Sequence, residues 1–175
     1  MKAVSALVAE EHPASISVPA VAARAEVGVA TVYRYFPTKE ALLDAAATGV
    51  VTPTAARLPR SFADLGRTLA AAWTELADQL PLVRNQFASP VGRDLHRRRW
   101  ETKHAAMIEG VRDEGIDPNS AAGRRLLGVT DVLTSSTALL ELHDKAGVPA
   151  ADAADWCAWA VDVLVSASKR ENPSR

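Results

Sequence analysis

Residues 17–43, SVPAVAARAEVGVATVYRYFPTKEALL, form the stretch around which the chain is organised. Apolar residues recur there at helical spacing behind Ser17, which can act as an N-cap, and a proline stands in the first turn, where a missing N–H costs nothing. Residues 26–28 interrupt this pattern, which resumes over residues 29–36. Pro37 ends the second segment, and the threonine after it can cap a third. The stretch therefore predicts three short helices separated by two breaks.

Two short helices joined by a tight turn are a helix-turn-helix, whose second helix fits the major groove of DNA. The helix predicted over residues 29–36 would be this reader helix. Its apolar residues and those of the preceding helix should form a small core. We assign to this core Val21, Val27, Val32 and Phe36.

The run from Ala25 to Leu42, AEVGVATVYRYFPTKEAL, resembles the DNA-binding signature of the TetR family of bacterial repressors. That signature reads roughly A-G-V-S-x-x-T-x-Y-x-Y-F-x-[ST]-K-[ED]-x-L, and the match is dense along its length. Two positions depart from it. Glu26 stands at the usual turn glycine and must adopt a turn conformation, and Gly28 replaces the usual serine-like cap. The rest of the chain resembles the family only in length, helical pattern and order.

The resemblance implies which side chains meet DNA. They are Ser17, Val29, Ala30, Thr31, Tyr33, Arg34, Tyr35 and Lys39. Small groups at the start of the reader helix can meet a thymine methyl group but make no bidentate hydrogen bond. Tyr33 would reach a phosphate with its hydroxyl, and Lys39 would do so from the start of the next helix. Packing in the core of the three-helix unit is the alternative interpretation for Tyr33.

Composition favours helices and argues against several other classes. The chain has 175 residues, a length that allows one or two small domains with a hydrophobic core. Hydrophobic residues make up 48% of it and aromatic residues 5%. The sequence contains no apolar run long enough to span a membrane and no basic-then-apolar signal segment. Cys157 is the single cysteine, so an internal disulfide and a metal site built from cysteines are excluded. A reducing, cytoplasmic setting is the default expectation.

The charge of the chain neither favours nor excludes DNA binding. The formal net charge is −1. Residues 1–60 carry six basic and five acidic residues, which argues against non-specific binding through many phosphate contacts. A dimer that reads two half-sites through a few well-placed groups remains compatible with this balance.

The prolines at positions 53 and 59 mark the predicted domain boundary. We expect an all-α fold in which residues 1–52 form the helix-turn-helix DNA-binding domain and residues 53–175 form a helical regulatory and dimerisation domain. A short amphipathic helix is predicted over residues 2–11. The first helix of the family usually begins earlier, after a basic arm, so residues are missing before Met1 or the chain is naturally short at this end.

Further helices are predicted over residues 61–80 and 94–114, from Asn119 or Ser120 to about Asp144, and from Asp152 to about Lys169. The last two are apolar nearly all round and must be buried on two sides. A partner subunit can cover the second side through a symmetric four-helix interface, which is also how members of the family form homodimers. The alternative is a single helical core wrapped by the remaining helices.

The family resemblance also implies a small-molecule effector enclosed by the regulatory helices. The candidate pocket residues are Trp73, Phe87, Trp100, His104, Met107 and Asp131, because large apolar groups with a few polar ones describe a typical site. Core packing is the alternative for each aromatic residue. Asp131 is costly if buried without a partner. The polar side chains of residues 134–137 could line a pocket, form hydrogen bonds with one another and Asp131, or allow close helix packing at the dimer interface.

Other motifs have simpler interpretations. The arginines at 97–99 should form a solvated face, because Asp94 and Glu101 lie within pairing reach. Of the four histidines, His96 and His104 are spaced to share a helical face, but none shows the zinc-hydrolase pattern, and we expect no metal site. The sequence has no phosphate loop and no nucleophile elbow. We therefore expect no catalytic residues and no cofactor, and we do not expect an enzyme.

Together these features predict a ligand-responsive transcriptional repressor that binds a near-palindromic double-stranded DNA operator as a homodimer. A small molecule would release the operator only if it prefers the conformation that binds DNA poorly. Two alternatives stay open. One is a DNA-binding dimer without a ligand, and the other is a helical partner-binding dimer without operator binding.

Overall fold

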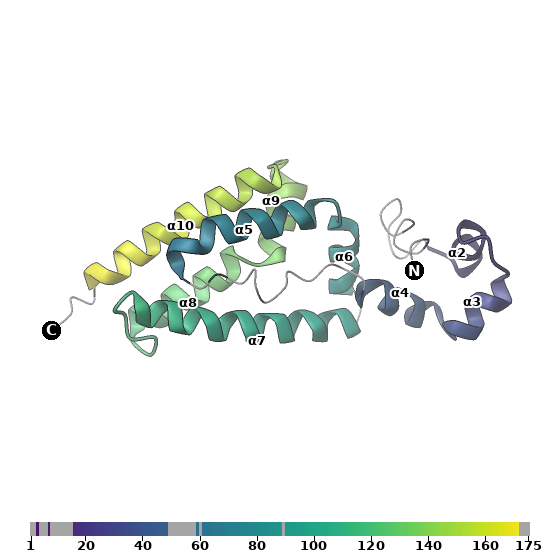
Figure 1. Ribbon diagram of the computed structural model, residues 1–175, viewed down its shortest axis with the longest axis horizontal. Coiled ribbons are helices and arrows are strands. Elements are labelled where there is room, and N and C mark those ends of the chain that lie inside the picture. The colour runs from purple at the N-terminus through teal and green to yellow at the C-terminus, as the bar shows by residue number, and fades with distance from the viewer. Residues whose placement is uncertain are drawn as a thin grey trace. The chain divides into compact units, whose positions relative to one another are not determined.

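The computed structural model describes residues 3, 7, 16–48, 59, 61–88 and 90–171, and these residues form helices and no strand, which confirms the all-α class. The helices are α2 (Val18–Arg24), α3 (Val29–Tyr35), α4 (Lys39–Thr48), α5 (Phe62–Ala77), α6 (Leu80–Ala88), α7 (Pro90–Asp113), α8 (Ala121–Leu133), α9 (Ser136–Ala146) and α10 (Ala150–Glu171) (Figure 1). No helix of this described part is long and apolar enough to cross a membrane.

The chain divides into two compact units, one formed by residues 1–51 with 78–98 and the other by residues 52–77 with 99–175. The boundary predicted after residue 52 lies outside the described residues. So does the predicted first helix, except for its residues 3 and 7, which are helical. Leu7 is buried, as its place on the apolar side of that helix predicts.

The helix-turn-helix of the first unit follows the local signals of its sequence. Ser17 caps α2, because its Oγ accepts a hydrogen bond from the backbone N–H of Ala20 at 3.2 Å. Thr38 caps α4 in the same way, with its Oγ1 3.0 Å from the backbone nitrogen of Ala41. Helices α2 and α3 pack against each other over a small core. That core includes Ile16, Val18, Val21, Ala22 and Val32.

Helix α6 belongs to the same unit and contacts α4. The buried amide of Asn85 donates a hydrogen bond to the backbone carbonyl of Leu43 at 3.1 Å, which joins the two helices. The next helix, α7, begins at Pro90, before the predicted start at residue 94, and runs through Gly92. A Cβ atom at Gly92 would lie 2.3 Å from the carbonyl oxygen of Gln86, so this glycine allows two backbones to approach closely instead of ending a helix.

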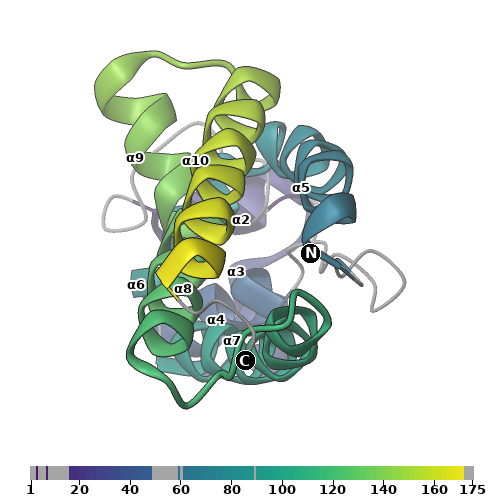
Figure 2. The same ribbon diagram turned by 90° about the vertical axis from the view of Figure 1, so that its left-hand side faces the viewer.

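The second unit is built around α10, which contacts α5, α8 and α9 (Figures 1 and 2). The helix predicted over residues 61–80 is α5, and it ends at Ala77. Its predicted apolar stripe faces inward: Phe62, Leu65, Leu69, Trp73 and Leu76 are all buried. The main cluster of the core combines residues of α5, α7, α8 and α10 with Ile116 of the α7–α8 connection. It consists of Phe62, Leu65, Met107, Val111, Ile116, Leu126, Leu127, Val161 and Val165.

The prediction of one long helix from residue 120 to residue 144 is wrong, because α8 ends at Leu133 and α9 begins at Ser136. Side chains between them bind the backbone. The hydroxyl of Thr134 donates to the carbonyl of Thr130 at 2.7 Å. Ser135 donates to the carbonyl of Val132 at 2.7 Å and accepts from the N–H of Ala138 at 3.1 Å. These bonds end one helix and cap the next.

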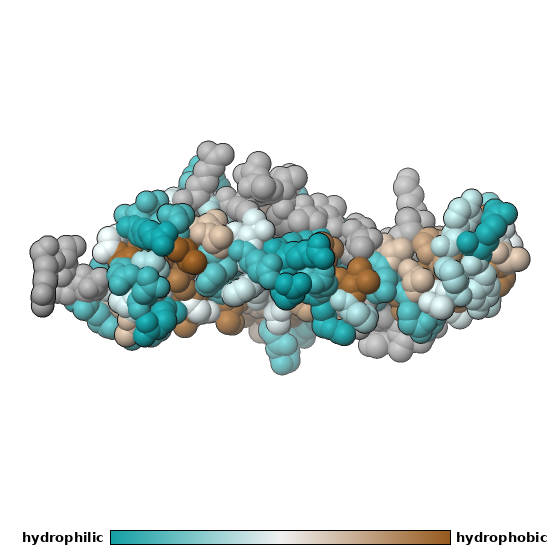
Figure 3. Space-filling view, turned by 90° about the horizontal axis from the view of Figure 1, so that it is seen from below, coloured by the Kyte–Doolittle hydropathy of each residue, from teal (hydrophilic) through white to brown (hydrophobic). Residues whose placement is uncertain are grey.

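The interpretation of the arginine run as a solvated face holds for two of its three residues, because Arg97 and Arg98 are exposed, whereas Arg99 is half-buried and burial lowers its pKa. Arg97 and Arg98 both pair with Asp94, the latter at 2.8 Å, and all three lie on the same helix. The hydrogen bond from Arg97 is the main reason why the pKa of Asp94 lies below its usual value. Hydrophilic residues predominate on the side of the molecule shown in Figure 3, and hydrophobic ones are scattered among them.

We expect the change Ser135→Ala to lower the free energy of unfolding by about 1 kcal/mol, because the first turn of α9 loses its side-chain cap. Denaturant unfolding followed by circular dichroism measures this. Ser136→Ala is the matched control, since that residue begins the helix and has no capping role, and it should change the stability little. Equal losses in the two variants would contradict the assignment of Ser135 as the cap.

Candidate DNA-binding surface and polar cluster

The N-terminal end of α3 presents small side chains to solvent. Gly28 precedes the helix in an extended conformation and makes no side-chain cap. Val29 and Ala30 are exposed, and Thr31 is half-buried. A flat surface of this kind allows a helix to approach base edges closely, and its methyl groups can contact thymine.

The aromatic residues of the motif also lie at the surface of this unit. Tyr33 is 48% exposed and Tyr35 is 68% exposed, so core packing, the alternative for Tyr33, does not describe this side chain. The guanidinium of Arg34 lies over the ring of Tyr35, 5.2 Å from its centroid, in a cation–π contact. Two phenolic hydroxyls and one guanidinium thus lie at the surface of α3, where they can donate hydrogen bonds.

The helix starts on either side of α3 carry the remaining predicted contacts. Ser17 is exposed before α2, and its hydroxyl oxygen already accepts the capping bond from Ala20. Lys39 is the first residue of α4 and is half-buried. A cation at this end of a helix opposes the helix dipole, so an anionic partner such as a phosphate would favour its position.

The turn between α2 and α3 depends on a left-handed backbone at Glu26, which has φ 54°. The N–H of Glu26 donates to the carbonyl of Ala23 at 3.1 Å, and the N–H of Val27 donates to that of Ala22 at 3.0 Å. This is the Schellman motif, in which the left-handed position is normally glycine. The end of α7 has the same pair of bonds, and there Gly115 takes the left-handed position, with φ 74°.

The assignment of Val27 to the core is wrong, since this side chain is 43% exposed. The left-handed residue before it reverses the chain and carries Val27 away from the apolar side of α2. Val21 and Val32 are buried as predicted, and Phe36 is half-buried. Glu26 is itself exposed and adds a negative charge directly before the reader helix.

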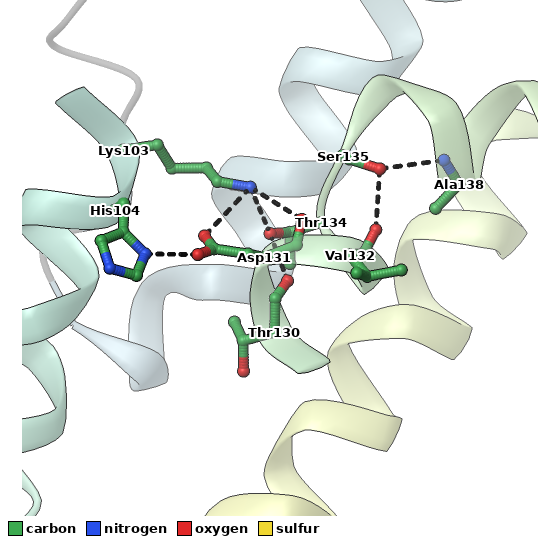
Figure 4. A network of polar contacts seen from close by, with 8 residues as sticks. All are labelled: Lys103, His104, Thr130, Asp131, Val132, Thr134, Ser135 and Ala138. Carbon is green, nitrogen blue, oxygen red and sulfur yellow. Dashed lines mark hydrogen bonds and ion pairs between the residues drawn. The ribbon is translucent and has the colours of Figure 1, made fainter. Parts of the chain in front are cut away.

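A second candidate site surrounds Asp131, a buried residue of α8 with 6% of its surface exposed. Its Oδ2 atom is bonded to Nδ1 of His104, and its Oδ1 atom lies 3.6 Å from Nζ of Lys103 (Figure 4). Lys103 also donates to the backbone carbonyl of Asp131 at 3.2 Å and to the hydroxyl of Thr134 at 3.0 Å. Asp131 therefore has the partners that its burial requires, and they link α7 to α8.

The cluster combines opposite charges with incomplete hydrogen bonding. Burial lowers the pKa of Lys103, and the charge of Asp131 opposes that shift. Among the described residues, the Oδ1 atom of Asp131 and the Oγ1 atom of Thr130 are buried without a hydrogen-bond partner. The hydroxyl of Thr130 points away from the other polar groups (Figure 4). Buried polar atoms of this kind can be satisfied by a water molecule or a ligand.

The structure brings together three of the predicted pocket residues. The ring of Trp100 stacks on that of His104 with centroids 4.7 Å apart, and His104 bonds Asp131. Trp73 and Met107 are buried in the same unit, and Met107 belongs to its core cluster. Phe87 belongs to the other unit, where its ring makes an edge contact with His96.

Lys103 and Thr130 are residues of this cluster that the sequence analysis missed, whereas Thr134 belongs to the polar run that it considered beside Asp131. The signal for Lys103 was present, because it lies four residues before Met107 and eight before Val111, both buried on the inner side of α7. A lysine on an apolar stripe predicts a buried charge that needs a partner. Across the described ranges, no three histidine, cysteine, aspartate or glutamate side chains are grouped so that they could hold a metal ion.

Two stripes of exposed apolar side chains lie on the contacting helices α8 and α10, and we call them together the α8–α10 face. It consists of Val129, Val132, Trp156, Trp159 and Val163. Trp159 is 70% exposed and Val132 is 66% exposed. Isolated apolar residues are normal on protein surfaces, but a group that includes two tryptophans marks an interaction surface.

Comparison with known proteins relates the chain to one group of regulators. Residues 2–46 match the sequence profile of bacterial regulatory proteins of the tetR family. A tetR-family transcriptional regulator from Streptomyces coelicolor has a similar structure, with a TM-score of 0.69 and 21% sequence identity over 97% of this chain and 79% of that chain. A TetR transcriptional regulator from Rhodococcus sp. RHA1 shares 20% identity over 99% of this chain and 96% of that one, with a TM-score of 0.49. No curated protein matches the chain.

We expect Glu26→Gly to raise the free energy of unfolding by roughly 1 kcal/mol, because glycine adopts the left-handed conformation without the steric cost that glutamate bears. Urea unfolding of the full chain measures the change. Glu26→Ala removes the charge but keeps the steric cost, so it should give no such gain. A similar gain in both variants would show that the charge of Glu26, and not its backbone, limits stability.

The lowered pKa of Lys103 predicts a pH dependence of stability. As pH rises toward the ordinary lysine value of about 10.4, the folded protein loses this proton before the unfolded chain does. The unfolded state then binds more protons, so the unfolding free energy of the wild type should rise relative to that of Lys103→Met. Denaturant unfolding of both proteins between about pH 8 and pH 10 tests this.

Lys145→Met is the control for that experiment. Lys145 is exposed and pairs with Glu141, which raises its pKa, so its contribution to stability should fall as pH rises. A wild-type stability that falls relative to Lys103→Met over the same range would contradict the assignment of Lys103 as a buried cation.

Proposed function

Since residues 2–46 match the tetR family of bacterial regulatory proteins, we propose that this chain is a TetR-type repressor that binds a near-palindromic operator as a homodimer in the cytoplasm and releases it when a small molecule binds. The exposed surface of α3 is the observation that carries this proposal. Motif residues that would be buried in a merely structural three-helix unit are instead accessible, above all Tyr33 and Tyr35.

In the proposed complex α3 enters the major groove and the flanking helices hold the phosphates. The small side chains of Val29 and Ala30 allow close approach, and Thr31 adds one hydroxyl near the bases. Tyr33 and Lys39 bind phosphates. The guanidinium of Arg34 lies over the ring of Tyr35, and the two side chains together contact the edge of the groove.

The α8–α10 face supports the dimer. Two exposed tryptophans and three exposed valines on one surface would be costly to leave in water, and a second copy can bury them in a four-helix interface. A symmetric dimer presents two reader helices to half-sites about one helical turn of DNA, or a multiple of it, apart. Operator symmetry then mirrors protein symmetry.

The cluster around Asp131 supports the response to an effector. A small molecule with hydrogen-bonding groups can bond the Oδ1 atom of Asp131 or the hydroxyl of Thr130 and compete with Lys103 and His104. Such competition would change how α7 and α8 are joined. The effector releases DNA if it binds more tightly to the conformation with low operator affinity.

Fluorescence anisotropy on the DNA that flanks the gene, against a scrambled sequence and over a salt series, tests DNA recognition. We expect sequence-selective binding by the wild type and a loss of roughly tenfold for Tyr33→Phe, which removes one hydrogen bond to a charged group. Lys39→Ala should weaken binding to every sequence and reduce the salt slope by about 1. The control Lys145→Ala, in the second unit, should leave both quantities unchanged.

Unchanged affinity in the Tyr33 and Lys39 variants would remove α3 and α4 as the reader. A chain that forms dimers but shows no selective binding would favour the alternative function, a helical partner-binding dimer without an operator. Where binding is selective, the same assay identifies effectors as compounds that lower the anisotropy.

A further inference from the structure

Gly128 lies in the interior of α8 on its exposed side. Glycine is the least favourable residue in a helix interior after proline, so such a position calls for a reason. Elsewhere the reason is a close approach within the chain, as at Gly123, where a Cβ atom would lie 2.1 Å from the carbonyl oxygen of Asp117. At Gly128 an added Cβ would meet no atom of the described residues within 4 Å.

The surroundings of Gly128 place it on the apolar face described above. Arg124 lies one turn before it and Val132 one turn after it, and both are exposed. Val129 is its direct neighbour and belongs to the α8–α10 face. The glycine therefore makes a shallow gap in the side chains of α8, next to apolar groups that are open to solvent.

The charges on this surface fit a second copy of the chain. The exposed side of α8 begins with Arg124 and Arg125, whereas that of α10 begins with Asp152 and Asp155. Arg125 bonds Glu171 at 2.6 Å, so the start of α8 lies beside the end of α10, and the two charged regions are at opposite ends of the face. A two-fold axis through its apolar middle brings the basic end of one copy against the acidic end of the other.

We propose that a helix of a second copy crosses α8 at Gly128, where the missing side chain lets the two backbones come into contact. This inference rests on the homodimer proposed above and adds the point of closest approach. The valines and tryptophans of the α8–α10 face pack around the crossing. Arg124 at the start of α8 faces carboxylates of the partner subunit, while Arg125 keeps its bond to Glu171 of its own chain.

Sedimentation equilibrium of the full chain over a dilution series measures the dissociation constant of the dimer. Gly128→Leu should raise this constant roughly ten- to hundredfold, because an added side chain overpacks the crossing. Ala71→Leu is the matched control on the exposed side of α5 and should leave it unchanged. Circular dichroism of each variant checks that the helices are intact.

Gly128→Ala separates the two possible roles of the glycine. Alanine favours a helix more than glycine does. If Gly128 faces only water, the Gly128→Ala variant should therefore have a higher midpoint of thermal unfolding at low concentration and an unchanged dissociation constant of the dimer. A crossing predicts instead that Gly128→Ala weakens the dimer although its helix propensity is better. An unchanged constant in both the alanine and the leucine variants of a dimeric wild type would overturn this inference alone. A wild type that stays monomeric at every concentration would overturn it together with the proposed dimer.

Discussion

Burial of the inner side of α10 is the constraint on which the second unit depends. The inner side of this helix carries small residues at the points of contact with its neighbours, including Ala153, Ala154 and Cys157. Small residues let helices approach closely. At Gly66 of α5, for example, an added Cβ atom would lie only 3.3 Å from the Cβ atom of Ala158. The outer side carries Trp156 and Trp159 instead, which no such packing explains. The same helix thus organises the core of one chain and supplies most of the surface proposed for its partner.

Helix α8 is constrained on three sides by different forces. Leu126 and Leu127 pack in the core, Asp131 is held by charges from α7, and Val132 is exposed on the proposed dimer face. The polar contacts are the adjustable ones of the three. Burial disfavours the charge of Lys103, and the Oδ1 atom of Asp131 has an ion pair with Lys103 but no hydrogen bond, so the cluster is less completely satisfied than the apolar core. A substitution or a change of protonation in this cluster would therefore disturb the contacts of Asp131 before it disturbed the packing of Leu126 and Leu127.

The parts of the fold that the sequence predicts are those set by neighbours along the chain. Ser17 and Thr38 cap helices because the acceptor and the N–H lie three residues apart, and a single sequence contains that information. The break between α8 and α9 escaped prediction because apolar residues recur on both sides of Thr134 and Ser135, whose hydroxyl bonds to the backbone interrupt the helix. Val27 was misplaced because its orientation depends on one left-handed residue before it.

The polar cluster shows a different limit of prediction. Asp131 stands out in sequence as a carboxylate among apolar residues, but its partners lie 27 and 28 residues away on another helix. Their identity depends on how α7 and α8 pack, which local spacing does not fix. Lys103 was recognisable only as a misplaced charge on the inner stripe of α7, and Thr134 only as one of several hydroxyl residues. The contacts among these side chains are determined by the packing of α7 against α8.

The adjacency of Asp131 and Val132 gives a physical route between the two proposed sites. Successive residues of a helix point about 100° apart, so one side chain can face α7 while the next faces a partner subunit. A shift of α8 that follows from rearranged contacts at Asp131 must also move Val132, and a well-packed interface responds to small displacements by changing its packing. Linkage then works in both directions: if effector binding alters the dimer, dimer geometry alters the affinity for the effector by the same factor. Coupling of this kind requires no chain of contacting residues through the core, because the single helix α8 contributes to both the polar cluster and the proposed dimer interface.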